Sequence, residues 1–227
     1  CTGSELVDPG QAMQAGQIYN SNRYLMAGLC AGLGFNLIDL GIVADQAETT
    51  LMALEQAVAQ VDVLVTSGGV SVGEEDYIKA AAQRLGQLEF WQLASKPGKP
   101  MVFGHIQNKP FLGLPGNPAS VLVTFTVLAR PFLLALQGQC IDSTEQLVLT
   151  GQLLNPPARF SDRQQYLRAR VAPSTVEEGL HLEILADQNS AVLTTSIKGH
   201  GLVVVPPGQA GTDVGRVVFL PYSSLEC

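Results

Sequence analysis

The sequence predicts an α/β domain with a three-layer, mainly parallel sheet, followed by a small all-β domain. Between residues 17 and 136, short β-branched or aliphatic runs alternate with longer stretches of helical period, which is typical of βαβ units. From about residue 141 the helical periods vanish, and short alternating runs separated by Pro and Gly clusters follow. We therefore expect an α/β domain over residues 1–140 and a barrel-like or two-sheet domain over residues 141–227.

The elements of the first domain follow from local patterns. Short apolar or β-branched runs predict strands at residues 17–20, 36–43, 61–66, 88–94, 100–105 and 110–113. Apolar residues at helical spacing predict helices at residues 23–33, 47–60, 76–85 and 119–136. Asn22 and Asn117 are expected to cap the first and last helices, with Pro118 at a first helical position. Residues 107–109 are expected to form the turn between the last two strands.

In the second domain, short alternating runs predict strands at residues 146–150, 165–171, 180–185, 201–205 and 214–219. Turn clusters at residues 155–157 and 206–208 separate some of these runs. Strands of this length with such turns favour a small barrel or a two-sheet fold.

Composition limits the classes of function. A net charge of −7 and a pI near 4.9 exclude a surface that binds nucleic acid, because such a surface needs clustered Lys and Arg. No run of 18 apolar residues occurs, so we expect a soluble, cytoplasmic chain without a membrane span. The cysteines lie far apart and favour free thiols over disulfides or a zinc site; they are Cys1, Cys30, Cys140 and Cys227. Because the chain starts at Cys1 without Met, we expect a fragment of a longer protein.

Two glycine-rich loops, residues 67–69 and 113–117, each follow a predicted strand. Ligands of open parallel sheets bind at the carboxyl ends of strands, and glycines let backbone N–H groups approach phosphate oxygens. A helix that starts after Asn117 would add a favourable dipole. These glycines could serve tight turns alone, but two such loops at one sheet edge favour a phosphate site. Neither loop has a P-loop or a dinucleotide-binding pattern, so a Rossmann dehydrogenase is disfavoured.

Charged residues accompany these loops. Lys96 and Lys99 lie in a Pro-Gly turn after a predicted strand, which favours an oxyanion site over solvated lysines. Glu5, Asp45 and Asp76 are expected near the same edge, where a phosphate would need a bridging cation such as Mg²⁺.

Other readings of the titratable residues remain open. Asp76 is equally suited to cap a helix, and we interpret Glu74 and Glu75 as a solvated first helical turn. The histidines are scattered and do not form a nucleophilic triad; they are His105, His181 and His200.

Five motifs, taken together and in order, resemble the molybdopterin molybdenumtransferases, the MoeA and gephyrin E-domain family. They are residues 2–6, 18–22, 66–73 with Asp76, 96–100 and 113–120. The Ser-Gly-Gly loop alone is also similar to that of the molybdopterin adenylyltransferases. The resemblance covers the whole chain and implies a MogA-like molybdopterin-binding domain followed by the family's C-terminal β domain.

The resemblance implies an enzyme that inserts molybdate into adenylylated molybdopterin and releases AMP, with Mg²⁺ present. The implied catalytic and metal-binding acids are Glu5, Asp45 and Asp76. The implied pterin-phosphate residues are Thr66, Ser67, Gly68, Gly69, Ser71, Gly113, Pro115, Gly116 and Asn117. The implied molybdate residues are Lys96, Lys99, Ser120, Arg163 and Ser190.

The chain departs from the family in two respects. Ser4 stands where the family usually has Asp, and the family's two N-terminal domains are missing. Because those domains help to form the dimer and complete the active site, we expect weak ligand binding and slow or no turnover from these residues alone. We expect a homodimer in the full-length protein, with a molybdopterin adenylyltransferase as a partner.

Two alternative functions stay open. One is molybdopterin adenylylation, which the β domain disfavours, and the other is a non-catalytic molybdopterin-binding scaffold. The same lysines would serve tungstate as well as molybdate.

Overall fold

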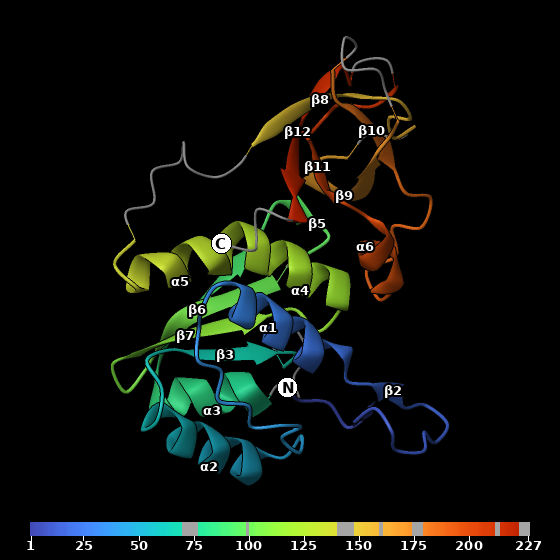
Figure 1. The fold of residues 1–227 in the computed structure, drawn as a ribbon. Coiled ribbons are helices and arrows are strands. Elements are labelled where there is room, and N and C mark those ends of the chain that lie inside the picture. Colours follow the sequence, from blue (N-terminus) through green and yellow to red (C-terminus); the bar gives the residue numbers. More distant parts are fainter. Residues whose placement is uncertain are drawn as a thin grey trace. The chain divides into compact units, whose positions relative to one another are not determined.

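A computed structural model describes residues 1–69, 77–98, 100–139, 148–158, 161–173, 179–211 and 214–222 (Figure 1). The chain forms two compact units. Cys1–Leu93 and Gly98–Phe125 make up the first unit, and Ala94–Pro97 and Thr126–Cys227 make up the second. The predicted domain boundary at residues 140 and 141 lies outside the described residues.

The first unit contains a four-stranded mixed sheet with the order β3, β7, β6, β4. These strands are Leu64–Ser67, Lys109–Leu114, Pro100–Ile106 and Gly86–Gln92. β3 pairs with β7 in parallel, whereas β6 is antiparallel to both β7 and β4. The α/β class is confirmed, but the expectation of a mainly parallel sheet is wrong for the described strands.

The β6–β7 hairpin explains this difference. Gln107 and Asn108 form its turn with φ values of 50° and 81°, the left-handed backbone that two-residue hairpin loops require. A connection this short joins only antiparallel neighbours, because parallel strands need a crossover of a dozen or more residues. The turn itself was predicted correctly from its Gln-Asn-Lys sequence.

Helices lie on both faces of this sheet, with α2 and α3 on one side and α1 and α4 on the other (Figure 1). Their bounds are Ser21–Gly32 for α1, Ala47–Val58 for α2, Tyr77–Leu85 for α3 and Pro118–Thr124 for α4. Beneath α2 and α3, Leu54 and Ile78 pack with Val102, Ile106 and Phe111 of the sheet, and all five side chains are buried. These apolar contacts fix the helices against the strands that carry the glycine loops.

Residues 36–43 do not form the expected strand, and their region contributes a bridge between Val43 and Thr2. The Asp39 carboxylate instead accepts a hydrogen bond from the Gly41 N–H at 2.8 Å, and Gly41 has a φ of 69°. A local side-chain bond of this kind stabilises a turn in place of a strand ladder. The predicted strand at residues 17–20 is present as β2, Ile18–Tyr19, which pairs in parallel with β1, Leu6–Val7.

A long apolar helix follows the second glycine loop. It continues from α4 through a π-helical turn, Phe125–Ala129, into α5, Arg130–Leu136. By length and composition alone, Pro118–Leu136 would be able to cross a membrane, with a mean hydropathy of 1.9. However, 67% of this stretch is buried inside the protein, which is what the core helix of a folded domain shows.

The second unit contains the expected barrel. Its strands are β8 Leu149–Leu153, β9 Gln164–Val171, β10 His181–Ile184, β11 Gly201–Val205 and β12 Arg216–Pro221. They pair in the order β10, β8, β12, β11, β9, and a further pairing between β10 and β9 closes the ring. A short strand from earlier in the chain, β5 Ser95–Lys96, adds to the start of β9. A short helix, α6 Thr194–Lys198, precedes β11.

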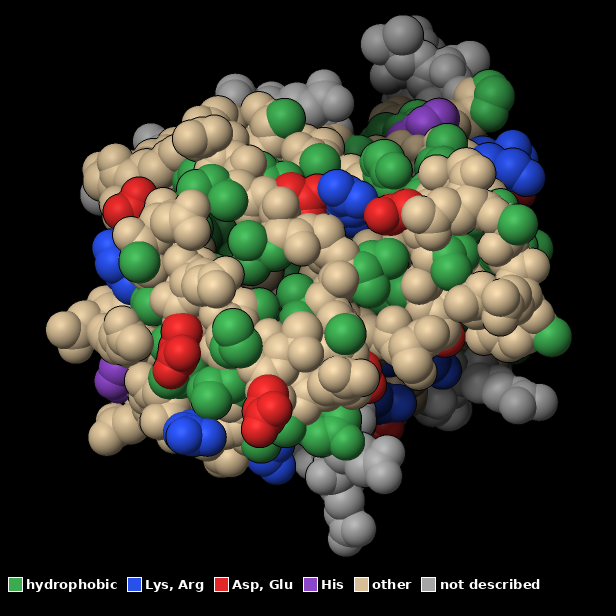
Figure 2. Space-filling model, turned by 90° about the horizontal axis from the view of Figure 1, so that it is seen from below, with side chains coloured by type: hydrophobic (Ala, Val, Ile, Leu, Met, Phe, Trp, Pro, Cys, Tyr) green, Lys and Arg blue, Asp and Glu red, His purple; other side chains and the backbone are tan. Residues whose placement is uncertain are grey.

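The surface carries charged side chains of both signs. Figure 2 shows that Lys and Arg side chains are interspersed with Asp and Glu over the described part of one face. Both described cysteines, Cys1 and Cys30, are free. Burial raises the pKa of the Cys30 thiol above its usual value.

The Phe111→Ala substitution tests the core under the sheet. Phe111 is fully buried, so removing its ring leaves a cavity and should cost about 3–5 kcal/mol of unfolding free energy. Chemical denaturation measures this loss. Met52→Ala, at a side chain that is 57% exposed, should change the same free energy by less than about 0.5 kcal/mol. Equal effects of the two substitutions would contradict this assignment of the core.

Candidate anion-binding site

Two glycine loops lie side by side at one edge of the mixed sheet. The parallel register of β3 and β7 places Ser67 opposite Leu114, so both strands end together. The Gly68 N–H donates a hydrogen bond to the Leu114 carbonyl at 3.2 Å. A Cβ built on Gly116 would come within 3.8 Å of the Gly68 Cα. The structure therefore brings together the two loops that the sequence singled out.

The first loop has the geometry that only glycine adopts without strain. Gly68 and Gly69 have φ values of 87° and 65°. A Cβ on Gly68 would lie 2.9 Å from the Thr2 carbonyl oxygen, and one on Gly69 would lie 2.7 Å from Cγ1 of Ile78. Approaches this close leave no room for a side chain at either position.

Asn22 joins the two loops. Its side-chain Nδ2 donates one hydrogen bond to Ser67 Oγ at 2.7 Å and another to the Gly116 carbonyl at 2.6 Å. Ser67 Oγ in turn donates to the Pro115 carbonyl at 3.3 Å. Asn22 was predicted as the cap of α1, and that prediction is wrong.

The cap of α1 is Asn20, whose side-chain oxygen accepts from the Arg23 N–H at 3.3 Å. Because Asn20 fills this position, the Asn22 side chain is available for the glycine loops. Sequence reasoning missed this role, since either Asn suits the start of a helix.

Two polar atoms at this edge have unused hydrogen-bonding capacity. Thr66 is 8% exposed, and its Oγ1 has no hydrogen-bond partner among the described residues. The Asn22 Oδ1 atom is likewise buried without a partner in the described part of the chain. Native proteins satisfy most buried polar atoms, so each of these two atoms is exceptional.

The helix that starts at Pro118 begins directly after the second loop. Asn117 occupies the cap position with an extended backbone (φ −72°, ψ 129°), as predicted, but its side chain makes no capping hydrogen bond to the helix. Ser120, in the first turn, is 5% exposed. The first N–H groups of a helix and its dipole attract anions. The second loop therefore leads into a region that favours a phosphate.

Two of the predicted acids are connected to the first loop through Thr2. The Thr2 N–H donates to the Ser67 carbonyl at 3.4 Å, and Thr2 also bridges to Val43, two residues before Asp45. The Glu5 carboxylate folds back over Gly3, where an added Cβ would be 2.8 Å from its oxygen. Glu5 and Asp45 are both exposed.

The other site residues of this region are only partly described. Asp76 and Ser71 lie outside the described residues. Within the described ranges, no group of three or more His, Cys, Asp or Glu side chains would hold a metal ion.

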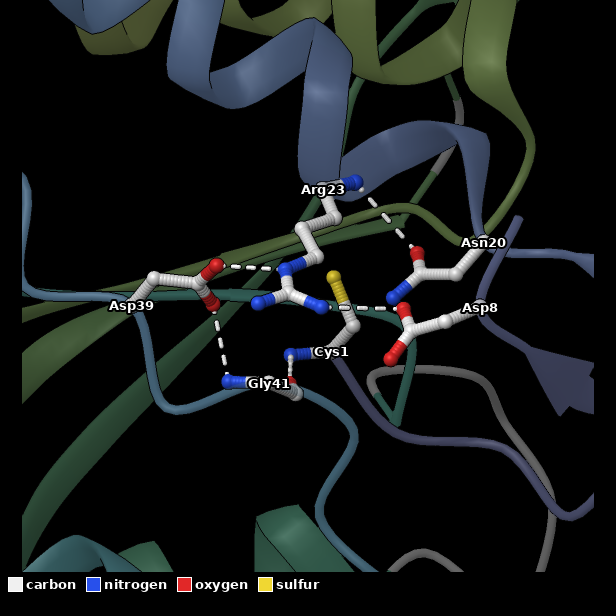
Figure 3. Close-up of polar contacts among 6 residues, drawn as sticks. All are labelled: Cys1, Asp8, Asn20, Arg23, Asp39 and Gly41. Atoms are coloured by element: carbon white, nitrogen blue, oxygen red, sulfur yellow. Dashed lines mark hydrogen bonds and ion pairs between the residues drawn. The ribbon is translucent and has the colours of Figure 1, made fainter. Parts of the chain in front are cut away.

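Arg23 connects the segments near Glu5 and Asp45 by hydrogen bonds (Figure 3). Its Nη1 donates to the Asp8 carboxylate at 3.0 Å, and its Nε donates to the carboxylate of Asp39. Asp39 also accepts from Gly41. One guanidinium therefore connects helix α1 to the segment after β1 and to the turn before Asp45.

Hydrogen bonding sets the charge state of Asp39. Burial raises the pKa of this carboxyl, but the hydrogen bonds from the Gly41 N–H and the Arg23 guanidinium more than offset that effect. The net result is a pKa below the ordinary value of 3.8. Asp39 therefore stays charged through the neutral range and holds Arg23.

The residues of the predicted oxyanion site are divided between the two units. Ser120 belongs to the first unit, whereas Lys96, Arg163 and Ser190 belong to the second. In the second unit, Lys96 is exposed on β5 and pairs with Gln165 of β9. Arg163, just before β9, donates from Nη1 to the Ser95 carbonyl at 3.4 Å. The structure thus places Lys96 and Arg163 close together, while Lys99 lies outside the described residues.

Comparison with known proteins gives a consistent assignment. The model of the family described as "Probable molybdopterin binding domain" matches residues 1–135. The model of the "MoeA C-terminal region (domain IV)" matches residues 150–220. The two matches follow the order of the α/β unit and the barrel.

Individual relatives agree with these family models. The chain is 49% identical to a molybdopterin molybdenumtransferase of Haemophilus influenzae over 99% of its own length and 55% of the relative. It is 32% identical to the molybdenum cofactor synthesis protein cinnamon of Drosophila melanogaster, over 90% of this chain and 34% of that protein. The chain therefore spans about half, or less, of the length of these curated relatives.

A solved structure is similar over almost the whole chain. The molybdopterin biosynthesis MoeA protein from Pyrococcus horikosii superimposes with a TM-score of 0.78 and 31% sequence identity. The match covers 97% of this chain and 52% of that one. Both the mixed-sheet unit and the barrel therefore have a counterpart in a solved protein.

Asn22→Ala tests the bridge between the loops. The substitution removes two hydrogen bonds and leaves the Gly116 carbonyl without this donor, so it should cost about 1–3 kcal/mol of unfolding free energy. Asn36→Ala is the matched control, because Asn36 is exposed and its loss should cost less than about 0.5 kcal/mol. Denaturation curves compare the two variants. A loss no larger for Asn22→Ala than for Asn36→Ala would show that the bridge does not hold the loops.

Asp39→Asn tests the Arg23 network through pH. A folded-state pKa below 3.8 means that the stabilisation is present above that pH and is lost as pH falls through the folded value. The difference in unfolding midpoint between the parent and Asp39→Asn should therefore be largest at neutral pH and shrink in acid. Asp62→Asn, at a fully exposed carboxylate, is the control and should show a smaller difference. A pH-independent difference for Asp39→Asn would refute the charge-based account.

Proposed function

Because the chain belongs to the probable molybdopterin binding domain family and continues into a MoeA C-terminal region, we propose that it acts in molybdenum cofactor biosynthesis as part of a molybdopterin molybdenumtransferase. In this reaction, molybdate is inserted into adenylylated molybdopterin and AMP is released. The observation that carries the proposal is the pair of glycine loops joined by Asn22 at one sheet edge.

The glycine loops bind the phosphate groups of the pterin substrate. Gly68 and Gly69 expose backbone groups of the first loop, and the N-terminus of the helix after Asn117 supplies further N–H donors. Thr66 Oγ1 and the Asn22 amide oxygen have no partner among the described residues and are further candidates for contact with polar atoms of the ligand. A hydroxyl can donate and accept, whereas the amide oxygen accepts only.

Glu5, Asp45 and Asp76 hold Mg²⁺ together with the substrate phosphates. Mg²⁺ usually binds through one or two carboxylates plus phosphate oxygens and keeps several waters, so a dedicated cage of protein ligands is not required. The exposed carboxylates of Glu5 and Asp45 fit that requirement. A bound Mg²⁺ would polarise the adenylyl phosphate. The carboxylates would orient Mg²⁺ relative to the substrate phosphates and balance its charge.

Lys96, Lys99, Ser120, Arg163 and Ser190 bind the molybdate. Arg163 and Lys96 supply positive charge for a dianion, and the contact of Arg163 with the Ser95 carbonyl joins Arg163 to the segment that carries Lys96. Serine hydroxyls add hydrogen bonds that select a tetrahedral oxyanion. Tungstate has nearly the same size and charge and would bind the same groups.

The C-terminal region favours insertion over adenylylation, because a molybdopterin adenylyltransferase resembles the α/β unit alone. A non-catalytic molybdopterin-binding scaffold stays open as the alternative. The substrate has to be adenylylated first, so an enzyme of that class must act before this one and is a candidate partner. We further propose a cytoplasmic homodimer for the complete enzyme.

An exchange experiment tests the proposed activity. The chain would replace the matching half of the Haemophilus influenzae molybdopterin molybdenumtransferase, to which it is 49% identical. With adenylylated molybdopterin and Mg²⁺, the chimera should release AMP when molybdate is added. Binding of the pterin without AMP release would contradict insertion and favour a scaffold. Release of pyrophosphate from ATP and molybdopterin would instead favour adenylylation.

Gly68→Ala tests the first glycine loop in the same chimera. The added methyl group meets the Thr2 carbonyl at 2.9 Å and shifts the loop, so the kcat/KM for AMP release should fall by about 10–100-fold. Gly16→Ala is a close control, because Gly16 has a φ of 86°, against 87° for Gly68, and has open space around it. This control imposes similar backbone strain away from the loops and should retain most activity. Equal losses for both variants would contradict a role for the loop in binding.

A further inference from the structure

Among the residues whose burial the structure describes, Arg168 is the largest side chain that is completely buried, with an exposed fraction of 0%. It lies in the middle of β9, opposite Leu202 of β11. Burying a guanidinium is costly because it loses its hydration. Burial lowers the pKa of Arg168, and the nearby Tyr222 and Asp187 offset this only in part. Leu167 and Ala169 belong to the barrel core, so Arg168 between them lies on the opposite face of β9. Its burial on that face needs a structural or functional reason.

The hydrogen bonds of Arg168 lead to one loop. Its Nη2 donates to the backbone carbonyls of Asp187 and Asn189, at 3.2 and 3.1 Å. These two carbonyls belong to the loop of residues 185–193, which links β10 to α6. No carboxylate forms an ion pair with Arg168 among the described residues. The guanidinium therefore holds backbone and does not neutralise an acid.

Gln188 completes the attachment of the same loop. Its Oε1 accepts from the Arg168 N–H at 2.9 Å, and its Nε2 donates to the Arg168 carbonyl at 2.9 Å and to the Leu185 carbonyl at 2.8 Å. The Leu185 N–H also donates to the Arg168 carbonyl. Main chain and side chain of Arg168 thus both bind residues 185–189.

Ser190 is flanked on both sides by this network. The Asn189 carbonyl accepts from Arg168, and the Asn189 side-chain oxygen accepts from the Ala191 N–H at 3.0 Å. The Asn189 N–H donates to the Asp187 carboxylate at 2.9 Å. The backbone on either side of Ser190 is therefore restrained by these hydrogen bonds.

We infer that Arg168 is a positioning residue for oxyanion binding, because its fork of hydrogen bonds to the Asp187 and Asn189 carbonyls fixes the loop that presents Ser190. The inference rests on the proposed function, in which Ser190 binds molybdate. It also makes β9 the strand to which all three segments of the proposed site are attached. The start of β9 pairs with Lys96 and follows Arg163 directly, and Arg168 holds the loop of Ser190. One strand then sets the positions of three oxyanion-binding side chains.

Molybdate binding to the full chain, measured by calorimetry, tests this inference. Arg168→Met removes both bonds to the loop and should weaken molybdate binding by about tenfold, the effect of losing charge-assisted hydrogen bonds that hold the site. Both bonds leave Nη2 at the end of the guanidinium. Arg168→Lys keeps the charge on a shorter side chain, so it should restore the affinity only in part. Arg170→Met is the matched control, because Arg170 lies on the same strand but pairs with Glu183, and it should change the affinity by less than about twofold.

A second readout separates positioning from general loss of structure. Amide hydrogen exchange at Ala191 and the neighbouring loop residues should speed up in Arg168→Met, while exchange in β11 and β12 stays slow. Ser190→Ala combined with Arg168→Met should weaken binding less than the product of the two single effects, since both act on one contact.

Several results would overturn the inference. They are full restoration of affinity by Arg168→Lys, unchanged affinity in Arg168→Met, loss of protection throughout the barrel in both variants, multiplicative effects in the double variant, or no molybdate binding by the parent chain. AMP release by the chimera reports independently on the proposed function, so a failure of the one is distinguishable from a failure of the other.

Discussion

The parallel pairing of β3 with β7 is the constraint on which the candidate site depends. Because Thr66 lies opposite Gly113 and Ser67 opposite Leu114, the strands end at one level and both glycine loops leave the sheet together. Ligand sites of open α/β sheets form where parallel strands end. Asn22 then fixes the separation of the loops, because its amide group donates to the Ser67 hydroxyl of the first loop and to the Gly116 carbonyl of the second. The β3–β7 pairing and the Asn22 side chain therefore define the geometry of the proposed ligand site.

Much of the fold was predictable because its signals are local. The period of α2, the Gln107-Asn108 turn and the alternating barrel strands each depend on residues within about one element's length. Sheet direction and barrel closure are different, because they depend on which distant strands meet. The β9–β10 pairing that closes the barrel, like the antiparallel β4–β6 pair, is set by tertiary contacts. Residues 36–43 show the opposite case, in which a local Asp39–Gly41 turn overrides an apolar run.

The candidate site was predictable where its residues form a recognisable local sequence pattern. Glycine loops and a Pro-Gly turn with lysines are visible in any sequence, and the structure places the two loops together. Asn22 was not predictable as a bridge, because its partners lie 45 and 94 residues away along the chain. The burial of Arg168 was equally hidden. An arginine between the core residues Leu167 and Ala169 is expected to face solvent, and the carbonyls that it binds lie 19 and 21 residues away along the chain.

The second unit is not one continuous stretch of sequence. Ser95 and Lys96 pair with Gln164 and Gln165, and residues 94–97 group with the barrel although more than 25 residues of the α/β unit separate them from it. A recombination event that exchanged residues 126–227 alone would deprive β9 of this neighbour and separate Lys96 from the strand beside Arg163. Residues 94–97 and the barrel are therefore expected to change together in evolution and to be inherited together.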